Sequence, residues 1–149
     1  MSHDDAAVEH SLPGGGRDNA RFRAVARVCI PEASALDEGQ WRDAEGIVAR
    51  ALAGRPASVR RQIALFMRVL DGLALVRHGR VFTALPADRA TRLLESLSRS
   101  RLLLMRRGVW GVRTLAFMGY YARADAARAI GYRAAAAGWS ARGESGVIT

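Results

Sequence analysis

The sequence contains no lysine, and all 23 of its cationic side chains are arginines. This absence excludes the P-loop lysine of nucleotide hydrolases, Schiff-base mechanisms and lysine general bases. The only cysteine is Cys29, so neither an internal disulfide nor a zinc site built on cysteine pairs can form. We therefore expect a protein made for a reducing compartment, or one that is indifferent to oxidation.

Catalytic side chains are equally scarce. Of the three histidines, His3 and His10 lie near the N-terminus, and only His78 falls in the periodic part of the sequence. A single histidine at a helix end is more often a cap that interacts with the helix dipole than a base. The zinc-protease, calcium-loop and nucleophile-elbow motifs do not occur. We expect no catalytic residues, no metal and no cofactor on this chain, which would then not be an enzyme.

The 149 residues suit a single domain. Residues 1–18 and 133–149 lack apolar periodicity, so we expect two flexible tails around a helical domain at 19–132. The N-terminal segment has neither a secretory pattern nor a twin-arginine motif. The expected location is therefore cytoplasmic, with any membrane association made through a complex.

Within 19–132, apolar residues recur at helical spacing. Pro31, Gly54, Gly79 and Pro86 separate the periodic segments. The predicted helices are 18–30, 39–52, 56–76, 88–97, 100–122 and 125–130, and Asp18 is the expected N-cap of the first. No segment predicts a strand. The sequence thus predicts an all-α fold, a single compact helical domain of about five or six helices.

Two of these helices are expected to be buried on more than one side. The helix at 56–76 has a second apolar stripe, formed by Leu65, Val69 and Val76. The helix at 100–122 is the most apolar, but it contains three arginines, Arg106, Arg107 and Arg113. Each arginine would cost about 2.5–3.5 kcal/mol near the centre of a bilayer. We therefore expect a buried central helix and no transmembrane segment.

Aromatic residues follow the helix at 100–122, namely Trp110, Phe117, Tyr120 and Tyr121. Core packing is their ordinary interpretation, and we expect it above all for Trp110 and Phe117. Protein interfaces, however, are enriched in aromatic residues, methionine and arginine. Tyr121 and Tyr132 follow predicted helix ends, from which a side chain can reach a partner. The candidate partner interface consists of Arg113, Phe117, Tyr120, Tyr121 and Tyr132.

Charge is unevenly distributed along the chain. Residues 1–54 carry a net charge of −3 and residues 55–149 a net charge of +12. The alternative function is therefore a basic helical adaptor that binds nucleic acid or an anionic membrane surface. Nucleic acid is an unlikely partner, because the connection at 78–87 is too long for a helix-turn-helix. Asp71 lies among apolar residues, and we expect it to pair with an arginine such as Arg68 or Arg106.

The region from residue 81 onward contains a series of short motifs in a specific order. These motifs are Val81–Arg89, Leu93–Ser100, Leu102-Leu103, Arg113–Leu115, Gly119-Tyr120-Tyr121 and Ile130-Gly131-Tyr132. Their order resembles the small helical subunit of bacterial sugar and gluconate dehydrogenases, of the gluconate 2-dehydrogenase subunit 3 type. It also resembles the helical domain that precedes the flavin domain of long-chain alcohol oxidases in the glucose–methanol–choline family. The likeness covers roughly residues 20–132.

The resemblance implies a helical unit that carries no cofactor itself. In that family it accompanies and stabilises a large subunit that contains FAD, so FAD is expected on the partner of this chain. The implied function is a non-catalytic small subunit of an alcohol or sugar oxidoreductase. Family members that direct export carry a twin-arginine signal, which this sequence lacks, so export is not part of the expectation.

Overall fold

The computed structural model describes Leu12 and residues 15–129, and the regular structure in this part of the chain is entirely helical. The α-helices are α2 (Gly16–Cys29), α3 (Glu38–Ala53), α4 (Ala57–His78), α5 (Ala87–Ser98), α6 (Leu103–Tyr121) and α7 (Ala124–Ala129). Two short 3-10 helices, η1 (Pro31–Ala35) and η2 (Phe82–Ala84), lie in the connections. The predicted all-α class is confirmed, and each predicted helix is present.

Local sequence signals determine most of the helix ends. Pro31 follows Ile30, whose extended backbone (φ −137°) ends α2. Helix α3 begins with a capping box, in which the Asp37 carboxylate accepts a hydrogen bond from the Gln40 backbone N–H at 2.8 Å. The Gln40 side chain in turn accepts one from the Asp37 N–H at 3.0 Å. Gly79 ends α4 in the left-handed conformation (φ 69°).

Helix α2 begins earlier than the sequence predicts. Its N-cap is Gly15 (φ 67°), and Asp18 lies inside the first turn, where it is buried and does not cap the helix. Residues 16–18 therefore belong to the helical domain and not to the expected N-terminal tail. Nearly all the rest of that tail, and the whole expected tail at 133–149, lie outside the described residues.

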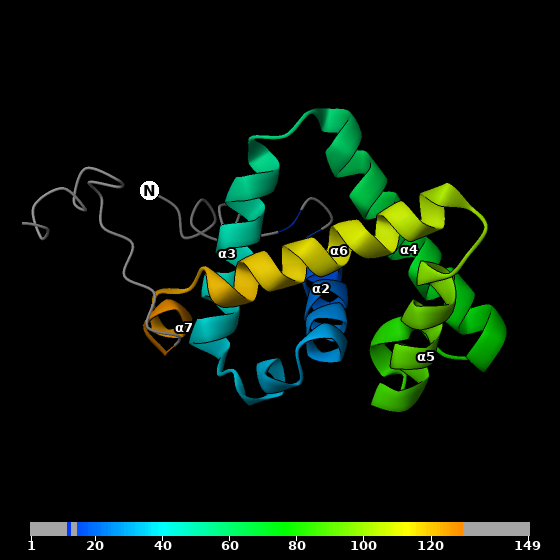
Figure 1. Ribbon diagram of the computed structural model, residues 1–149, viewed down its shortest axis with the longest axis horizontal. Coiled ribbons are helices and arrows are strands. Elements are labelled where there is room, and N and C mark those ends of the chain that lie inside the picture. Colours follow the sequence, from blue (N-terminus) through cyan, green and yellow to red (C-terminus); the bar gives the residue numbers. More distant parts are fainter. Residues whose placement is uncertain (1–11, 13–14, 130–149) are drawn as a thin grey trace, which may run out of the picture.

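Helix α6 is the central element of the fold. In Figure 1 it runs across the body of the molecule, with α3 crossing near one end, α4 near the other and α2 behind its middle. It contacts α2, α3, α4, α5 and α7. The core forms where these helices meet its inner side, and its most deeply buried large side chains include Phe22, Val48, Leu70, Phe82, Leu93 and Val112.

Two glycines allow α6 to approach its neighbours closely. A Cβ atom at Gly108 would lie 2.1 Å from the buried Phe66 ring of α4. A Cβ atom at Gly119 would lie 2.9 Å from Val48 Cγ2 and 3.1 Å from the Phe22 ring, so this end of α6 rests on α3 and α2. All three distances are shorter than an ordinary van der Waals contact. The backbone of α6 therefore lies where only glycine fits at these two positions.

A partly buried ionic cluster ties α2 to α4 and to η2. Arg21 Nε donates to Asp71 Oδ2 at 2.6 Å, and Arg21 Nη1 donates to Asp18 Oδ1 at 2.7 Å. The other Asp71 oxygen accepts the backbone N–H of Phe82 at 3.1 Å. Asp71 therefore pairs with an arginine as expected, but the arginine is Arg21, 50 residues distant in sequence, and not Arg68 or Arg106.

Helix α4 is packed on one side only. Its buried residues, Phe66, Met67, Leu70 and Ala74, form one stripe, and its neighbours are α2, α6 and η2. In the second stripe, Leu65 and Val76 are exposed. The expectation that this helix packs between neighbours on two sides is wrong, because its buried residues form a single stripe and the second stripe includes the exposed Leu65 and Val76.

None of the helices in the described part of the chain combines the length and the hydropathy that crossing a bilayer requires. This finding agrees with the expectation for the helix at 100–122, in which three arginines interrupt the apolar sequence.

Candidate functional site

The outer face of α6 is the side that no other described helix covers. We define it by Arg106, Arg107, Trp110, Arg113, Thr114, Phe117 and Tyr121. Each of these residues is classed as exposed, although the inner side of the same helix, with Val109, Val112, Ala116 and Gly119, is buried. Trp110 is 72% exposed, the highest value among the aromatic residues of the described chain. A large apolar surface therefore faces solvent on the central helix of the fold.

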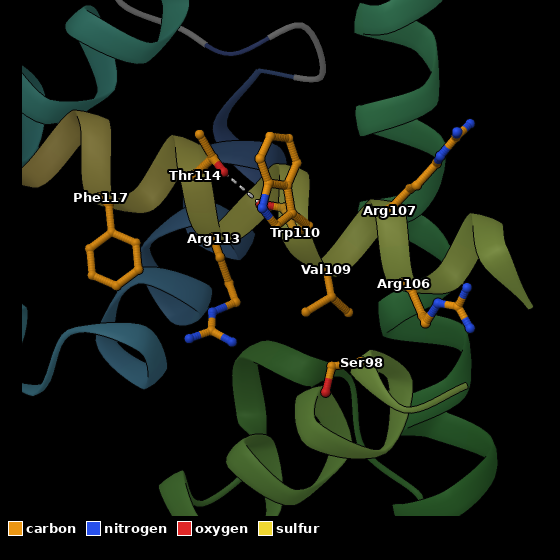
Figure 2. A pocket seen from close by; sticks show the side chains of 8 residues that line it. All are labelled: Ser98, Arg106, Arg107, Val109, Trp110, Arg113, Thr114 and Phe117. Atoms are coloured by element: carbon orange, nitrogen blue, oxygen red, sulfur yellow. Dashed lines mark hydrogen bonds between the residues drawn. The ribbon is translucent and has the colours of Figure 1, made fainter. Parts of the chain in front are cut away.

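A groove of about 630 Å³ runs along this face and reaches Ser98 at the end of α5. In Figure 2, Val109 points from α6 toward Ser98, with the side chains of Arg106 and Arg113 on either side of it. Phe117 lies further along α6, one turn beyond Arg113. The groove thus has an apolar wall with guanidinium groups along it, and its lining contains no acidic residue.

The arginines of the outer face have no acidic partner among the residues that the structure describes. Helix α6 contains no aspartate or glutamate, and none of Arg106, Arg107 and Arg113 forms an ion pair with a described residue. Arg106 makes only a long hydrogen bond, 3.3 Å from its Nη1 to the Ser100 carbonyl oxygen. Three positive charges within two helical turns repel one another, and a bound anion would relieve this repulsion.

The Thr114 hydroxyl is already used inside the helix. Its Oγ1 donates to the Trp110 carbonyl oxygen at 2.9 Å, which Figure 2 marks as a dashed line. A hydroxyl that is bonded to the preceding helical turn has its donor occupied. The free side-chain donors that the groove offers to a ligand are therefore the guanidinium groups and the indole N–H of Trp110.

The C-terminal end of the outer face carries an aromatic cluster. The rings of Phe117 and Tyr121 are nearly parallel with centroids 6.1 Å apart, and Tyr120 meets Tyr121 edge-on at 4.9 Å. Tyr120 is half-buried, packs against the core and lies under the guanidinium of Arg123 at 4.6 Å. Phe117 and Tyr121 are available to a partner, whereas Tyr120 fixes their position.

Arg123 connects this aromatic cluster to α3 and α7. It is buried, and its Nε donates to Asp125 Oδ1 at 3.2 Å, while Gln40 Nε2 donates to the other Asp125 oxygen at 2.8 Å. Desolvation would raise the pKa of Asp125, but the hydrogen bonds from Arg123, the Ala126 N–H and Gln40, with the Arg123 charge, hold it below its ordinary value. Asp125 is therefore ionised near neutral pH and joins α7 to the start of α3.

The described cysteine and histidine, Cys29 and His78, both lie on helices other than α6. The Cys29 thiol is half-buried on α2, and its burial raises its pKa although the charge of Arg113 acts in the opposite direction. His78 is the last residue of α4, as expected for a helix-end histidine. No group of three His, Cys, Asp or Glu side chains within residues 15–129 has the arrangement of a metal site.

The structure divides the predicted interface residues into three groups. Arg113, Phe117 and Tyr121 lie together on the outer face, Tyr120 lies beneath them, and Tyr132 lies outside the described residues. The expectation of a buried Trp110 and Phe117 is wrong, because glycine and small residues occupy the inner side of α6. The prediction missed Trp110, Arg106 and Arg107 as surface residues, although the absence of acids from this helix was a usable signal.

Comparison with protein-family models, with curated proteins and with solved structures finds no match for this chain. The outer face of α6 is therefore interpreted from its own chemistry. Exposed aromatic rings can bury apolar groups of a ligand, and unpaired guanidinium groups bind carboxylates or phosphates through two parallel hydrogen bonds. A surface of this composition is suited to binding.

Proposed function

We propose that the chain is a non-catalytic small subunit that binds and stabilises a larger protein, an FAD-dependent alcohol or sugar oxidoreductase of the glucose–methanol–choline type. One observation carries the proposal. The central helix of the fold has a closely packed inner side and leaves Trp110, Phe117 and Tyr121 exposed on its outer face.

The composition of the outer face supports a protein as the ligand. The core of a protein interface is enriched in Trp, Tyr, Phe, Met and Arg and depleted of Lys, Glu and Asp. The outer face combines Trp, Phe, Tyr and three arginines with no acid. Trp, Tyr and Arg are also the residues that contribute most of the affinity when they are buried at the centre of an interface.

The motifs that carry the family resemblance lie next to the groove, which supports a flavoprotein as the partner. The motifs that resemble the small dehydrogenase subunit begin at Val81 and include Gly119-Tyr120-Tyr121. In the structure these segments form η2, α5 and α6, which are the elements around the groove and the aromatic cluster. The part of the chain with the resemblance is thus the part with the uncovered surface.

Co-purification tests this function. The tagged chain is isolated from its native host, and any co-purifying protein is identified and examined for a flavin absorption spectrum. We expect a large FAD-containing protein. Trp110→Ala and Tyr121→Ala should each weaken this complex by about thirtyfold, the equivalent of about 2 kcal/mol. Circular dichroism of the two variants should remain that of a helical protein.

Leu65→Ala provides the matched control, because Leu65 is an exposed apolar residue on α4 that does not line the groove. It should bind the flavoprotein as the unmodified chain does. A co-purifying partner without FAD would contradict the proposed partner. Unchanged affinity of both α6 variants would contradict the proposed surface.

A second candidate function is favoured by the turn between α5 and α6. Leu102 in this turn and Leu103 and Leu104 in the first turn of α6 are all exposed, next to Arg101 and Arg106. Exposed leucines beside arginines can insert into an anionic membrane surface. Sedimentation with vesicles rich in phosphatidylglycerol distinguishes the two functions. Vesicle binding that is lost in high salt and in Leu103→Glu would favour the membrane over the flavoprotein.

A further inference from the structure

We propose that the groove between α5 and α6 receives an acidic segment of the partner polypeptide that is anchored by an apolar side chain. The inference rests on the proposed function, since it assumes that a protein covers the outer face of α6. Carboxylates of the segment would pair with Arg106 and Arg113, and its apolar side chain would pack against Trp110 and Phe117.

The spacing of these four residues defines the length of the segment. Arg106, Trp110, Arg113 and Phe117 follow one another at intervals of four, three and four residues, so they lie in one row along the helix. The row covers about 16 Å at 1.5 Å per residue. Cation and aromatic ring alternate along it. A matching ligand carries acids and an apolar residue at similar intervals, within about three helical turns.

The charges indicate an acidic ligand more strongly than a second copy of this chain. No acid lines the groove, and its arginines form no ion pair with a described residue. In a symmetric dimer through this face, the arginines of one copy would meet those of the other, and like charges at an interface are costly. Guanidinium and carboxylate groups, in contrast, have matching planar geometry.

The shape of the site favours a polypeptide over a flat anionic surface. The groove is a hollow between two helices, with Val109 pointing toward Ser98 and the arginines beside it (Figure 2). A side chain on a peptide backbone can enter such a hollow while its flanking carboxylates reach the arginines. A vesicle surface presents its charges in a plane and contacts the protruding leucines of the α5–α6 turn first.

Selection of peptides from a random phage-displayed library against the full chain tests this inference. We expect the enriched peptides to contain several Asp or Glu residues around an aromatic or aliphatic residue. Their binding should fall at least tenfold on Arg113→Glu and on Arg106→Glu. Arg61→Glu is the matched control, since Arg61 is exposed on α4 and does not line the groove. It should bind the peptides as the unmodified chain does.

A charge exchange makes the test specific. Replacing the acids of the best peptide by lysine should abolish binding to the unmodified chain and restore binding to the doubly reversed chain, Arg106→Glu with Arg113→Glu. A variant that only lost its fold would not recover binding in this way. A single-stranded oligonucleotide that binds more tightly than the peptides, through the same arginines, would show that the groove binds phosphate and would overturn the inference.

Other outcomes would overturn the inference for different reasons. Neutral or basic enriched peptides, no enrichment at all, or peptides that bind the reversed variants equally would each show that the groove does not select acids. Self-association of the chain that is lost in Trp110→Ala would show that a second copy covers the face. If the flavoprotein complex depends on Trp110 but not on the charges at 106 and 113, the proposed function stands and the acidic segment is wrong. If peptides bind as expected but no flavoprotein co-purifies, the groove inference stands and the proposed partner is wrong.

Discussion

Two regions of the molecule combine tryptophan with arginine, and they differ in whether acids are present. On the α2–α3 side, Trp41 is 3% exposed and lies under Arg23 and Arg27, whose guanidinium carbons are 5.5 and 5.0 Å from its ring centroid. Arg23 is bound by Glu45 and Glu38 of α3. On the outer face of α6, Trp110 lies among arginines with no acid in the groove lining.

The two regions have similar aromatic and arginine content. They differ in whether acidic residues are present to pair with the arginines. Around Trp41 the hydrogen bonds from Arg23 lower the pKa of Glu38, and the carboxylates of α3 in turn raise the pKa of Arg23. The charge of Arg23 is thus paired within the chain. Around Trp110 the arginines of the outer face form no ion pair with a described residue.

The largest expected difference is between the two tryptophans themselves. Trp41→Ala should lower the free energy of unfolding by about 3–5 kcal/mol, because it removes a buried aromatic side chain. Trp110→Ala should change it by only about 0.5 kcal/mol or less, as for an exposed position. Denaturant unfolding followed by circular dichroism measures both. Equal losses would place Trp110 in the core and remove the basis of the comparison.

A smaller difference is expected between glycines on the two sides of α6. Gly108→Ala should lower the free energy of unfolding by about 1–3 kcal/mol, because the added methyl group overlaps the Phe66 ring. Gly111→Ala is the matched control in the same helix. No atom lies within 4 Å of its added Cβ, so the helix should gain up to about 1 kcal/mol. Thermal or urea unfolding of both variants gives the sign, and a stabilising Gly108→Ala would show that α6 does not rest on α4.

The smallest expected difference in stability is between a buried and an exposed acidic residue, Glu45 and Asp88. Glu45→Gln should lower the free energy of unfolding by about 1–2 kcal/mol, because the buried carboxylate loses its charge toward Arg23 while the amide oxygen still accepts a hydrogen bond. Asp88→Asn is the control, since its pair with Arg92 is exposed on α5. It should change stability by about 0.5 kcal/mol or less. Similar losses in urea unfolding would mean that the α2–α3 pairs contribute no more than surface ones.

The helices could be predicted from the sequence because their signals are local. Proline, glycine and the Asp37–Gln40 capping box act within a few residues of each helix end. The partner of Asp71 could not be predicted, because Arg21 reaches it only through the packing of α2 on α4. Arg68 and Arg106 were the expected partners, which shows the limit of reasoning from charge without topology.

The orientation of α6 is where hydropathy gave the wrong answer. Large aromatic residues normally face the core, so Trp110 and Phe117 were expected inside. Which residues of α6 face the core depends instead on how closely the helix approaches α4, α3 and α2. At Gly108 and Gly119 the approach is so close that no side chain fits. Glycine therefore lies on the inner side at these two contacts, whereas Trp110 and Phe117 lie on the outer face. Three of the five predicted interface residues, Arg113, Phe117 and Tyr121, are exposed on the outer face, and their contact with a partner stays a prediction.

The two glycine contacts have a mechanical consequence for binding. Gly108 and Gly119 are eleven residues apart, so α6 rests on α4 at one point and on α3 and α2 at another about 16 Å away. Because α6 is in close contact at both points, a tilt or a shift of the helix toward its neighbours would make its backbone overlap Phe66 or Val48. The residues from Arg106 to Phe117 lie on the same stretch of α6, so their backbone positions are held by the same two contacts. A ligand that bound this row would meet a helix backbone that is already held in place, which would lower the entropic cost of association.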